Sequence, residues 1–321
     1  MDAHNDPVSK RIAAALVAIA LVGLVSCSSD GTESSKTSVE NAGPIMITNE
    51  DVSYPIPAGQ PWDDNSAQRI VTLATGSGEI VTALGGADRI VGRDETSNAP
   101  EIESVPVVTA AHAVNAEQVI ALNPDVVLVD SSTSPPEAIA QIKDSGITVV
   151  EIPEAWSRIE TVEKVQSIGA AIGAPTNSVV YVKDQALGRA AELPQTNHRV
   201  AFLYLRGTSA IYLVGGVGSG ADSLIADSGA LDVGAEAGLE AFTPMTAEEL
   251  VNLNPDTILV MTEGLESVGG VDGLFSLPGL AQTEAAQTRH VVAVDDTLLL
   301  SFGARTGALL AALNSAWQQL K

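Results

Sequence analysis

The sequence predicts an α/β protein of two lobes, each with a central, mostly parallel sheet, joined by a single long rigid helix. Three observations predict this fold. Short apolar runs of buried-strand length alternate with helical patterns along the chain. One stretch of the first half recurs in the second half. A chain of 321 residues, 45% of them hydrophobic, is long enough to bury two cores.

The first 27 residues have the pattern of a sorting segment. Lys10 and Arg11 precede an apolar stretch over 12–25, which is too short for a comfortable membrane span. The run LVSC then resembles a lipobox, in which Cys27, the single cysteine of the chain, is acylated and becomes the new N-terminus. The alternative is an ordinary signal peptide with a chance cysteine. We expect a lipoprotein signal peptide over 1–26 and a lipid-anchored protein on the extracytoplasmic face of the cell membrane.

A tether is expected to follow the acylated cysteine. Residues 28–44 are small, polar and free of aromatic side chains, which is typical of a flexible linker. We assign 27–65 to the acylated cysteine and this tether. The apolar residues after position 44 leave open an edge strand before the main fold.

The first lobe is assigned to 66–174. The stretch 69–92 has the pattern of a strand, a glycine-rich turn, a helix and a second strand. The apolar runs 126–130 and 147–152 are further strands, with a helix around 136–145 between them.

The second lobe, 195–321, repeats this scheme, with strands expected at 200–205, 257–261 and 291–295. The repeat is visible in the letters: NAEQVIALNPDVVLV (115–129) and TAEELVNLNPDTILV (246–260) align without a gap. Both contain a helix cap, an acid, an apolar helical stripe, Asn-Pro-Asp and a strand. The connecting helix is assigned to 175–194, from Pro175 to Pro194, and its ~18 residues would span about 27 Å.

Charge and motifs exclude several functions. The formal charge of −24 disfavours nucleic acid as a partner, which rewards basic surfaces. The sequence contains neither the G-x-S-x-G motif of serine hydrolases nor the H-E-x-x-H motif of zinc proteases, so a hydrolase is disfavoured. The run GVGSGA (216–221) fits a relaxed dinucleotide fingerprint, but Glu240 does not end a clear strand, so nucleotide binding is disfavoured.

Three residues form the predicted binding site. Parallel α/β lobes bind ligands beyond the carboxyl ends of their strands. His112 follows the apolar run 105–110 of the first lobe, and Tyr204 and Arg206 end the run 200–205 of the second. Tyr204 and Arg206 are two apart and point the same way along a strand. Ferric haem accepts a histidine nitrogen or a tyrosine oxygen, and a nearby arginine favours the phenolate.

Each of these residues also has a structural interpretation. His112 could be a solvated loop side chain, Tyr204 a packing residue, and Arg206 the partner of one of many acids. Met261, at the end of 257–261, could line the pocket or act as a weak ligand, although core packing is the favoured interpretation. His198 and His290 follow the pattern of surface turns. Zinc or manganese capture would need several converging ligands.

The duplicated element and the lipobox together resemble the substrate-binding proteins of ABC importers whose two Rossmann-like lobes are joined by one rigid helix. Members of that class bind ferric siderophores, cobalamin or haem. The run YLRGT (204–208), with a histidine upstream of AEQVIALNPD, is similar to the haemin-binding lipoproteins of Gram-positive haem importers. The resemblance implies that His112 and Tyr204 ligate iron from opposite faces and that Arg206 hydrogen-bonds the tyrosine.

The resemblance also implies partners. Glu117 and Glu248, the acids of the duplicated element, would dock on arginines of an ABC permease dimer with its ATPase, and acids there also favour the helix dipole. We therefore expect a transport receptor for iron or haem and not an enzyme. Its cargo would be ferric haem b, and surface haem-donor proteins would be further partners. The alternatives are a ferric-siderophore or corrinoid receptor and, remotely, a secreted α/β enzyme.

Overall fold

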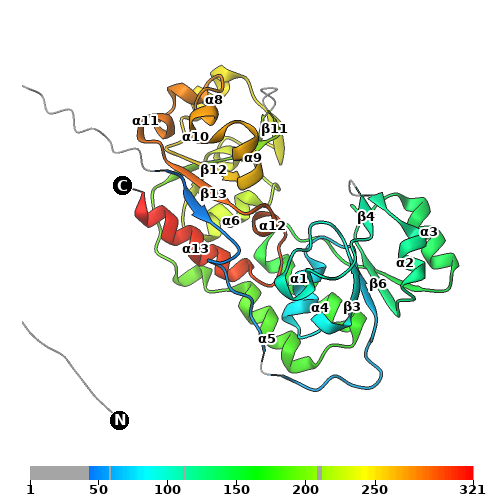
Figure 1. Cartoon of the computed structure of the whole chain (residues 1–321). Helices are drawn as coiled ribbons and strands as arrows, with labels where there is room; N and C mark the ends of the chain where they lie inside the picture. Colours follow the sequence, from blue (N-terminus) through cyan, green and yellow to red (C-terminus); the bar gives the residue numbers. More distant parts are fainter. Residues whose placement is uncertain (1–42, 58, 111–112, 208–211, 321) are drawn as a thin grey trace, which may run out of the picture. The chain divides into compact units, whose positions relative to one another are not determined.

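The first sheet has four parallel strands in the order β3-β2-β6-β7. The computed structural model describes residues 43–57, 59–110, 113–207 and 212–320. The central strands β2 and β6 are buried along their whole length, as expected for strands covered by helices, whereas the edge strands β3 and β7 are partly exposed. We call this half the N-terminal lobe (Figure 1). Its elements are β2 Ile70–Thr72, α1 Ser77–Ala83, β3 Ile90–Arg93, β4 Thr109–Ala110, β5 Ala113–Val114, α2 Ala116–Ala121, β6 Val126–Val129, α3 Pro136–Asp144, β7 Thr148–Glu151 and α4 Arg158–Ile172, with 3₁₀ turns at Ala87–Arg89 and Pro100–Ile102.

The second sheet belongs to the C-terminal lobe. In the described residues its strands follow the order β1-β13-β12-β8-β9-β11, and β10 also pairs with β8. Strands β1, β13, β12, β8 and β10 pair in parallel, whereas β9 and β11 are antiparallel. Its elements are β1 Ile45–Ile47, β8 Arg199–Leu205, β9 Tyr212–Gly215, α6 Ala221–Asp227, β10 Leu231–Asp232, α7 Val233–Glu236, β11 Phe242–Pro244, α8 Ala247–Leu253, β12 Thr257–Met261, α9 Thr262–Ser267, α10 Gly270–Leu274, α11 Glu284–Thr288, β13 Val291–Val294, α12 Asp296–Leu299 and α13 Thr306–Gln319, with a 3₁₀ turn at Leu280–Gln282.

Strand β1 shortens the expected tether. Ile45–Ile47 pairs in parallel with β13, so the edge strand left open by the sequence exists, and it belongs to the C-terminal lobe. The assignment of 27–65 to a flexible tether is therefore too long. The following segment crosses to the N-terminal lobe, where β2 begins at Ile70. This crossing is a second connection between the lobes, in addition to the connecting helix described below.

The connecting helix is shorter than expected. Helix α5 spans Thr176–Leu187 and is followed by a 3₁₀ turn at Ala190–Glu192, whereas the sequence predicted one helix over 175–194. It ends at Gly188, whose φ of 62° is left-handed. A Cβ at Gly188 would lie 2.6 Å from the Cα of Gly307, so α5 and α13 cross at close range. This glycine, and not Pro194, stops the helix.

The duplicated element makes equivalent hydrogen bonds in the two lobes. Asp125 accepts hydrogen bonds from the backbone N–H groups of Gln68 and Arg69, just before β2. Asp256 accepts two from the backbone N–H of Arg199, the first residue of β8. The Asn-Pro-Asp run therefore ties the start of one strand to the start of its neighbour in both sheets.

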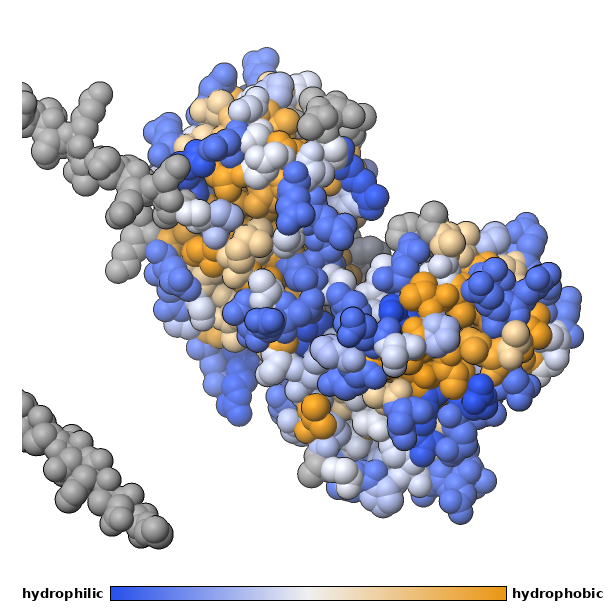
Figure 2. All heavy atoms as spheres, viewed as in Figure 1, coloured by the Kyte–Doolittle hydropathy of each residue, from blue (hydrophilic) through white to orange (hydrophobic). Residues whose placement is uncertain are grey.

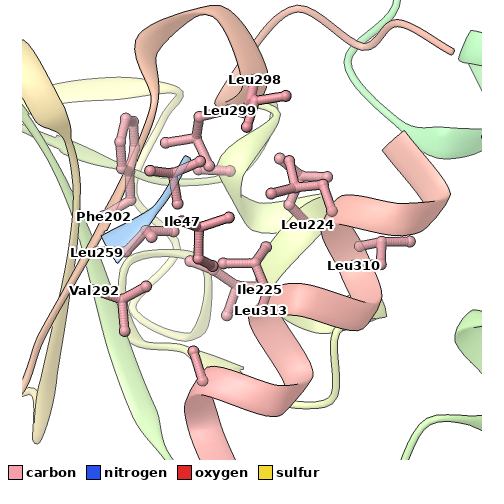
Figure 3. Close-up of a cluster of buried hydrophobic side chains, with 14 of the residues drawn as sticks. Ile47, Phe202, Leu224, Ile225, Leu259, Val292, Leu298, Leu299, Leu310 and Leu313 are labelled. Atoms are coloured by element: carbon pink, nitrogen blue, oxygen red, sulfur yellow. The ribbon is translucent and has the colours of Figure 1, made fainter. Parts of the chain in front are cut away.

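Apolar clusters hold the sheets to their helices. In the C-terminal lobe, Phe202, Leu259 and Val292 of the sheet pack against Leu224 of α6 and Leu313 of α13 (Figure 3). Hydrophilic side chains cover much of the visible face of the molecule (Figure 2). Within the described part of the chain, no helix combines the length and the apolar character needed to cross a bilayer.

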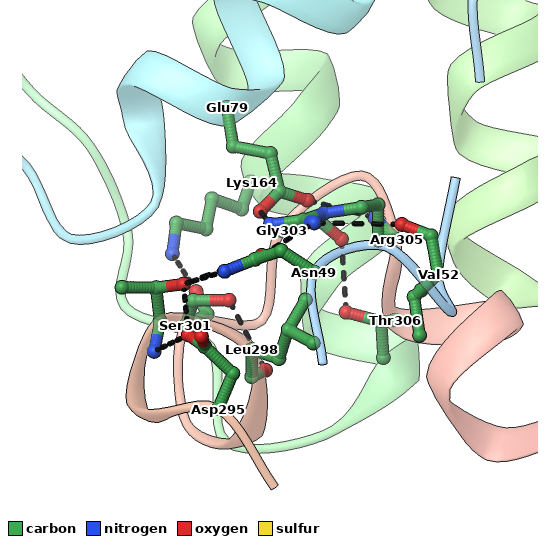
Figure 4. A network of polar contacts seen from close by, with 11 residues as sticks. Asn49, Val52, Glu79, Lys164, Asp295, Leu298, Ser301, Gly303, Arg305 and Thr306 are labelled. Atoms are coloured by element: carbon green, nitrogen blue, oxygen red, sulfur yellow. Dashed lines mark hydrogen bonds and ion pairs between the residues drawn. The ribbon is translucent and has the colours of Figure 1, made fainter. Parts of the chain in front are cut away.

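The lobes are joined by a buried polar cluster that we call the junction (Figure 4). The carboxylate of Glu79, on α1, accepts from the backbone N–H of Arg305 at 2.8 Å and from its Nη2 at 3.1 Å. Lys164, on α4, donates to the carbonyl of Ser301 at 3.0 Å. Arg305 is 2% exposed and also donates to Asn49 in the segment after β1. The junction thus connects α1, α4, the α12–α13 turn and the N-terminal segment.

Burial changes the pKa of the lysine in the junction. Burial lowers the pKa of the Lys164 ammonium to about 8, and nearby Asp130, Glu79 and Glu154 only partly offset this effect. A Cβ on Gly303 would lie 2.5 Å from Oε1 of Glu79, so a side chain there would displace the carboxylate. The turn before α13 therefore packs closely against α1 at this point of the junction.

Candidate functional site

The carboxyl ends of the strands of the two lobes face a common cavity. Thr75 follows β2, Asn98 follows β3, and Asp296 and Ser301 follow β13, and all four line a cavity of about 150 Å³. The cavity extends to Tyr54 and Glu79 at the junction. The cavity lies beyond the carboxyl ends of these strands, where parallel sheets bind ligands, but Tyr204, Arg206 and Met261 are not among the residues that line it.

Tyr204 and Arg206 lie together at the carboxyl end of β8. Nε of Arg206 donates to the phenol oxygen of Tyr204 at 2.7 Å, and Nη2 of Arg206 makes a second bond to that oxygen. The guanidinium carbon is 5.2 Å from the centre of the tyrosine ring. Tyr204 is half-buried and Arg206 is exposed. The alternation of strand side chains, which predicted the pairing of these two residues, thus gives a phenol oxygen held by two N–H donors.

A second aromatic side chain supports Tyr204. The ring of Phe242, on β11, meets the ring of Tyr204 edge to face, with centres 5.8 Å apart and planes at 69°. Sequence reasoning missed Phe242, because the antiparallel pairing of β9 with β11 cannot be read from local periodicity.

His112 lies outside the described residues. The antiparallel pair β4–β5 comes directly before and after positions 111–112. The prediction that His112 binds iron therefore stays a prediction. Cys27 and the signal peptide over 1–26 also lie outside the described residues.

Met261 ends β12 next to the hydrophobic core. Its side chain is half-buried and packs against the cluster that contains Phe202 and Leu259. This contact agrees with the favoured interpretation, core packing. Its role as a pocket residue or weak ligand stays a prediction.

The acids of the duplicated element are exposed and do not cap their helices. Glu117 and Glu248 are the second residues of α2 and α8. Asn115 caps α2, and Thr246 caps α8 together with Glu249 in a capping box. The side chains of Glu117 and Glu248 are thus left at the surface, free of this structural task.

His198 and His290, which were predicted to be surface residues, are half-buried and contact each other. Nε2 of His198 lies 3.0 Å from the carbonyl oxygen of Leu320, and the ring meets that of His290 at 6.4 Å. Burial lowers the pKa of His290, and His198 adds to the effect. Both residues precede strands, at the amino edge of the sheet, so they are remote from Tyr204. Neighbouring strand starts bring them together, which local polarity did not reveal.

Trp156 is a further residue of the lobe boundary. It follows β7, is 42% exposed, and donates from Nε1 to Glu154 at 3.3 Å. Its ring reaches the other lobe, since a Cβ on Gly220 would lie 3.2 Å from Cε3 of the indole. Among the residues that the structure describes, no group of three or more His, Cys, Asp or Glu side chains could hold a metal ion.

Known proteins share this architecture. A substrate-binding lipoprotein of an ABC transporter, YvrC of Bacillus subtilis, is 30% identical over 74% of this chain and 76% of its own. The haem-binding protein RhuT of Roseiflexus sp. RS-1 is 35% identical, with a TM-score of 0.73 over 79% of this chain and 99% of its own. The haem-binding protein HmuT is 30% identical, with a TM-score of 0.75 over 87% of this chain and 97% of its own.

Solved variants of HmuT replace a histidine, a tyrosine, and an arginine two positions after the tyrosine. Tyr204 and Arg206 have the same spacing. The family model for periplasmic binding proteins matches residues 70–298. The predicted fold class is thereby confirmed, and the chain belongs to the periplasmic binding protein family.

Proposed function

We propose that this protein is an extracytoplasmic receptor that binds ferric haem and delivers it to an ABC permease. The observation that carries the proposal is the phenol oxygen of Tyr204, held by two donors from Arg206 at the carboxyl end of β8. The likeness to haem-binding proteins of 30 and 35% identity supports it.

The chemistry of the pair suits ferric iron. A phenolate oxygen is a known axial ligand of haem, and its charge offsets the positive charge of the metal. The planar guanidinium of Arg206 can hold that oxygen in a fixed direction, which a flexible ammonium would do less well. His112 is the proposed ligand on the other face of the macrocycle, with Met261 as a lining residue.

The charges near the strand ends favour haem over an anionic ferric siderophore. The other described cations near the carboxyl edges are already engaged: Arg93 with main-chain carbonyls, Arg158 with Asp227, and Lys164 and Arg305 in the junction. Of the described cations near the carboxyl edges, Arg206 is the one that contacts neither a carboxylate nor a main-chain carbonyl in the contacts above. A polyanionic chelate would therefore find a single available cation there.

Acids add to this effect. Glu154 follows β7, Glu263 follows β12, and Asp296 follows β13. Their carboxylates repel a polyanionic chelate more strongly than haem, whose propionates also carry negative charge, over distances comparable to the Debye length, about 8 Å at physiological salt.

Absorption spectra of the purified protein with ferric haem test the proposal. We expect a strong Soret band, which weakens or shifts in Tyr204→Ala and in His112→Ala. Tyr181→Ala is the matched control, because Tyr181 lies on α5 and is 39% exposed. Failure of the wild type to retain haem would reject haem as the cargo, whereas an unchanged spectrum in both Tyr204→Ala and His112→Ala would reject these two residues as the iron ligands. Parallel titrations with cobalamin and a ferric siderophore test those alternatives, and turnover of a substrate without a retained ligand would indicate an enzyme.

The remaining assignments complete the proposal. Cys27 carries the lipid that anchors the protein, and Glu117 and Glu248 dock on the two subunits of the permease, which works with its ATPase. Surface proteins donate haem. The lobes comprise 66–174 and 195–321, with β1 completing the sheet of the second, and they move by small rocking, since the junction restricts wide opening.

A further inference from the structure

Phe242 occupies a diagonal position relative to Tyr204. In the register of the sheet, Tyr204 pairs with Leu213 of β9, and Leu213 pairs with Pro244 of β11. Phe242 precedes Pro244 by two residues, so it lies on the same face of the sheet, one row further back. Because β9 lies between β8 and β11, the two side chains meet across an intervening strand, and the contact is made by the rings, whose centres are 5.8 Å apart.

A glycine lies beside Phe242 on the intervening strand. Phe242 pairs across the sheet with Gly215, the last residue of β9. A Cβ at Gly215 would lie 2.7 Å from Cδ1 of Phe202 and 3.1 Å from Oγ of Ser219. At this position β9 therefore places no side chain beside Phe242, and Phe202 occupies the space next to the glycine.

The two contacts of Tyr204 constrain different degrees of freedom. The N–H groups of Arg206 fix the phenol oxygen but leave the ring free to turn about the line from Cβ to that oxygen. The edge-to-face contact with Phe242 fixes the plane of the ring. Together they determine the direction of the oxygen lone pairs.

We propose that Phe242 is a positioning residue that sets the ring plane of Tyr204, and thereby the geometry of the iron–oxygen bond. The inference rests on the proposed haem-binding function. Phe242 acts through Tyr204 and need not touch the cargo. Loss of its ring leaves the phenol and Arg206 in place but allows several ring orientations, so the bound haem becomes heterogeneous and leaves faster.

The test compares haem-loaded wild type with Phe242→Ala and Phe242→Tyr. In Phe242→Ala we expect a broadened ferric electron paramagnetic resonance signal, a shifted charge-transfer band, and release of haem to apomyoglobin about 2- to 10-fold faster, the range given by one aromatic edge contact. Phe242→Tyr keeps the ring and should restore all three values. Thr243→Ala, on the opposite face of β11, is the matched control.

The outcomes separate this inference from the proposed function. If Phe242→Ala gives the wild-type signal and release rate while Tyr204→Ala changes both, Phe242 has no positioning role and haem binding stands. Equal changes in Phe242→Ala and Thr243→Ala would indicate general loosening of β11 and also reject the inference. If wild type retains no haem, the proposed function has failed. Should Phe242→Ala fold poorly, Phe242→Leu removes the aromatic edge with little loss of volume.

Discussion

At the junction, Glu79 and Arg305 exchange two hydrogen bonds with both side chains nearly inaccessible to water, whereas at the end of β8 Arg206 is exposed. The junction links parts of the chain 226 residues apart. The tyrosine–arginine pair spans two residues of one strand. The difference indicates two separate roles: the junction fixes the spacing of the lobes, and the pair at the end of β8 holds a phenol oxygen in place close to the surface.

The largest expected effect breaks the junction. Glu79→Ala leaves the guanidinium of Arg305 buried without its partner, and removing one member of a buried ion pair costs about 3–5 kcal/mol of stability. Chemical denaturation measures this change in the free energy of unfolding. The control is Arg189→Ala, which breaks an exposed pair with Glu192 and should change stability by less than about 1 kcal/mol. Equal losses in the two variants would contradict the role assigned to the junction.

The next prediction concerns Lys164 and pH. Its pKa is about 8 in the folded state and 10.5 in the unfolded chain, so between these values the unfolded state binds more protons. Stability should therefore rise as pH increases from 8 to 10.5, by about 3 kcal/mol from this group alone. The rise should disappear in Lys164→Met. Burial also raises the pKa of Tyr54, which opposes the trend only near the top of that range.

A substitution at the end of β8 sharpens the contrast. Tyr204→Phe removes the phenol oxygen but keeps the ring and its contact with Phe242. We expect the free energy of unfolding to change by less than about 1 kcal/mol and haem affinity to fall by about 10- to 100-fold, equal to 1.4–2.8 kcal/mol. A large loss of stability with unchanged haem affinity would show that Tyr204 stabilises the fold and does not bind the iron.

The smallest effect on the isolated protein is expected at the duplicated acids. Glu117→Lys with Glu248→Lys reverses two exposed charges, so stability and haem binding should stay within about 0.5 kcal/mol of wild type. Haem uptake by cells should nevertheless be lost, because the permease can no longer be engaged. Glu137→Lys with Glu284→Lys, which reverses exposed acids in the first turns of α3 and α11, is the matched control. Normal uptake in the first double variant would exclude these acids from docking.

Local patterns predicted much of the fold. The apolar runs predicted the strands of the first sheet and β8, β12 and β13 of the second. The duplicated Asn-Pro-Asp marked equivalent positions, because Asp125 binds the start of β2 and Asp256 binds the start of β8. The pairing of Tyr204 and Arg206 followed from the alternation of side chains along one strand.

Long-range contacts could not be read in this way. Nothing in the run around Ile45 states that β1 joins β13 at the far end of the chain. The end of α5 depends on the approach of Gly188 to Gly307, and the burial of His198 depends on the C-terminal helix. The pairing of Glu79 with Arg305 likewise exists only after the lobes have met.

The place of Trp156 gives the molecule an intrinsic optical reporter. Its indole belongs to one lobe and contacts Gly220 of the other, while Trp317 is fully buried in the C-terminal core and Trp62 stacks under Arg89. A change in the separation of the lobes would alter the polarity around Trp156 and leave the other two indoles unchanged. Its fluorescence wavelength and lifetime can thus follow rocking of the lobes in solution without any attached dye.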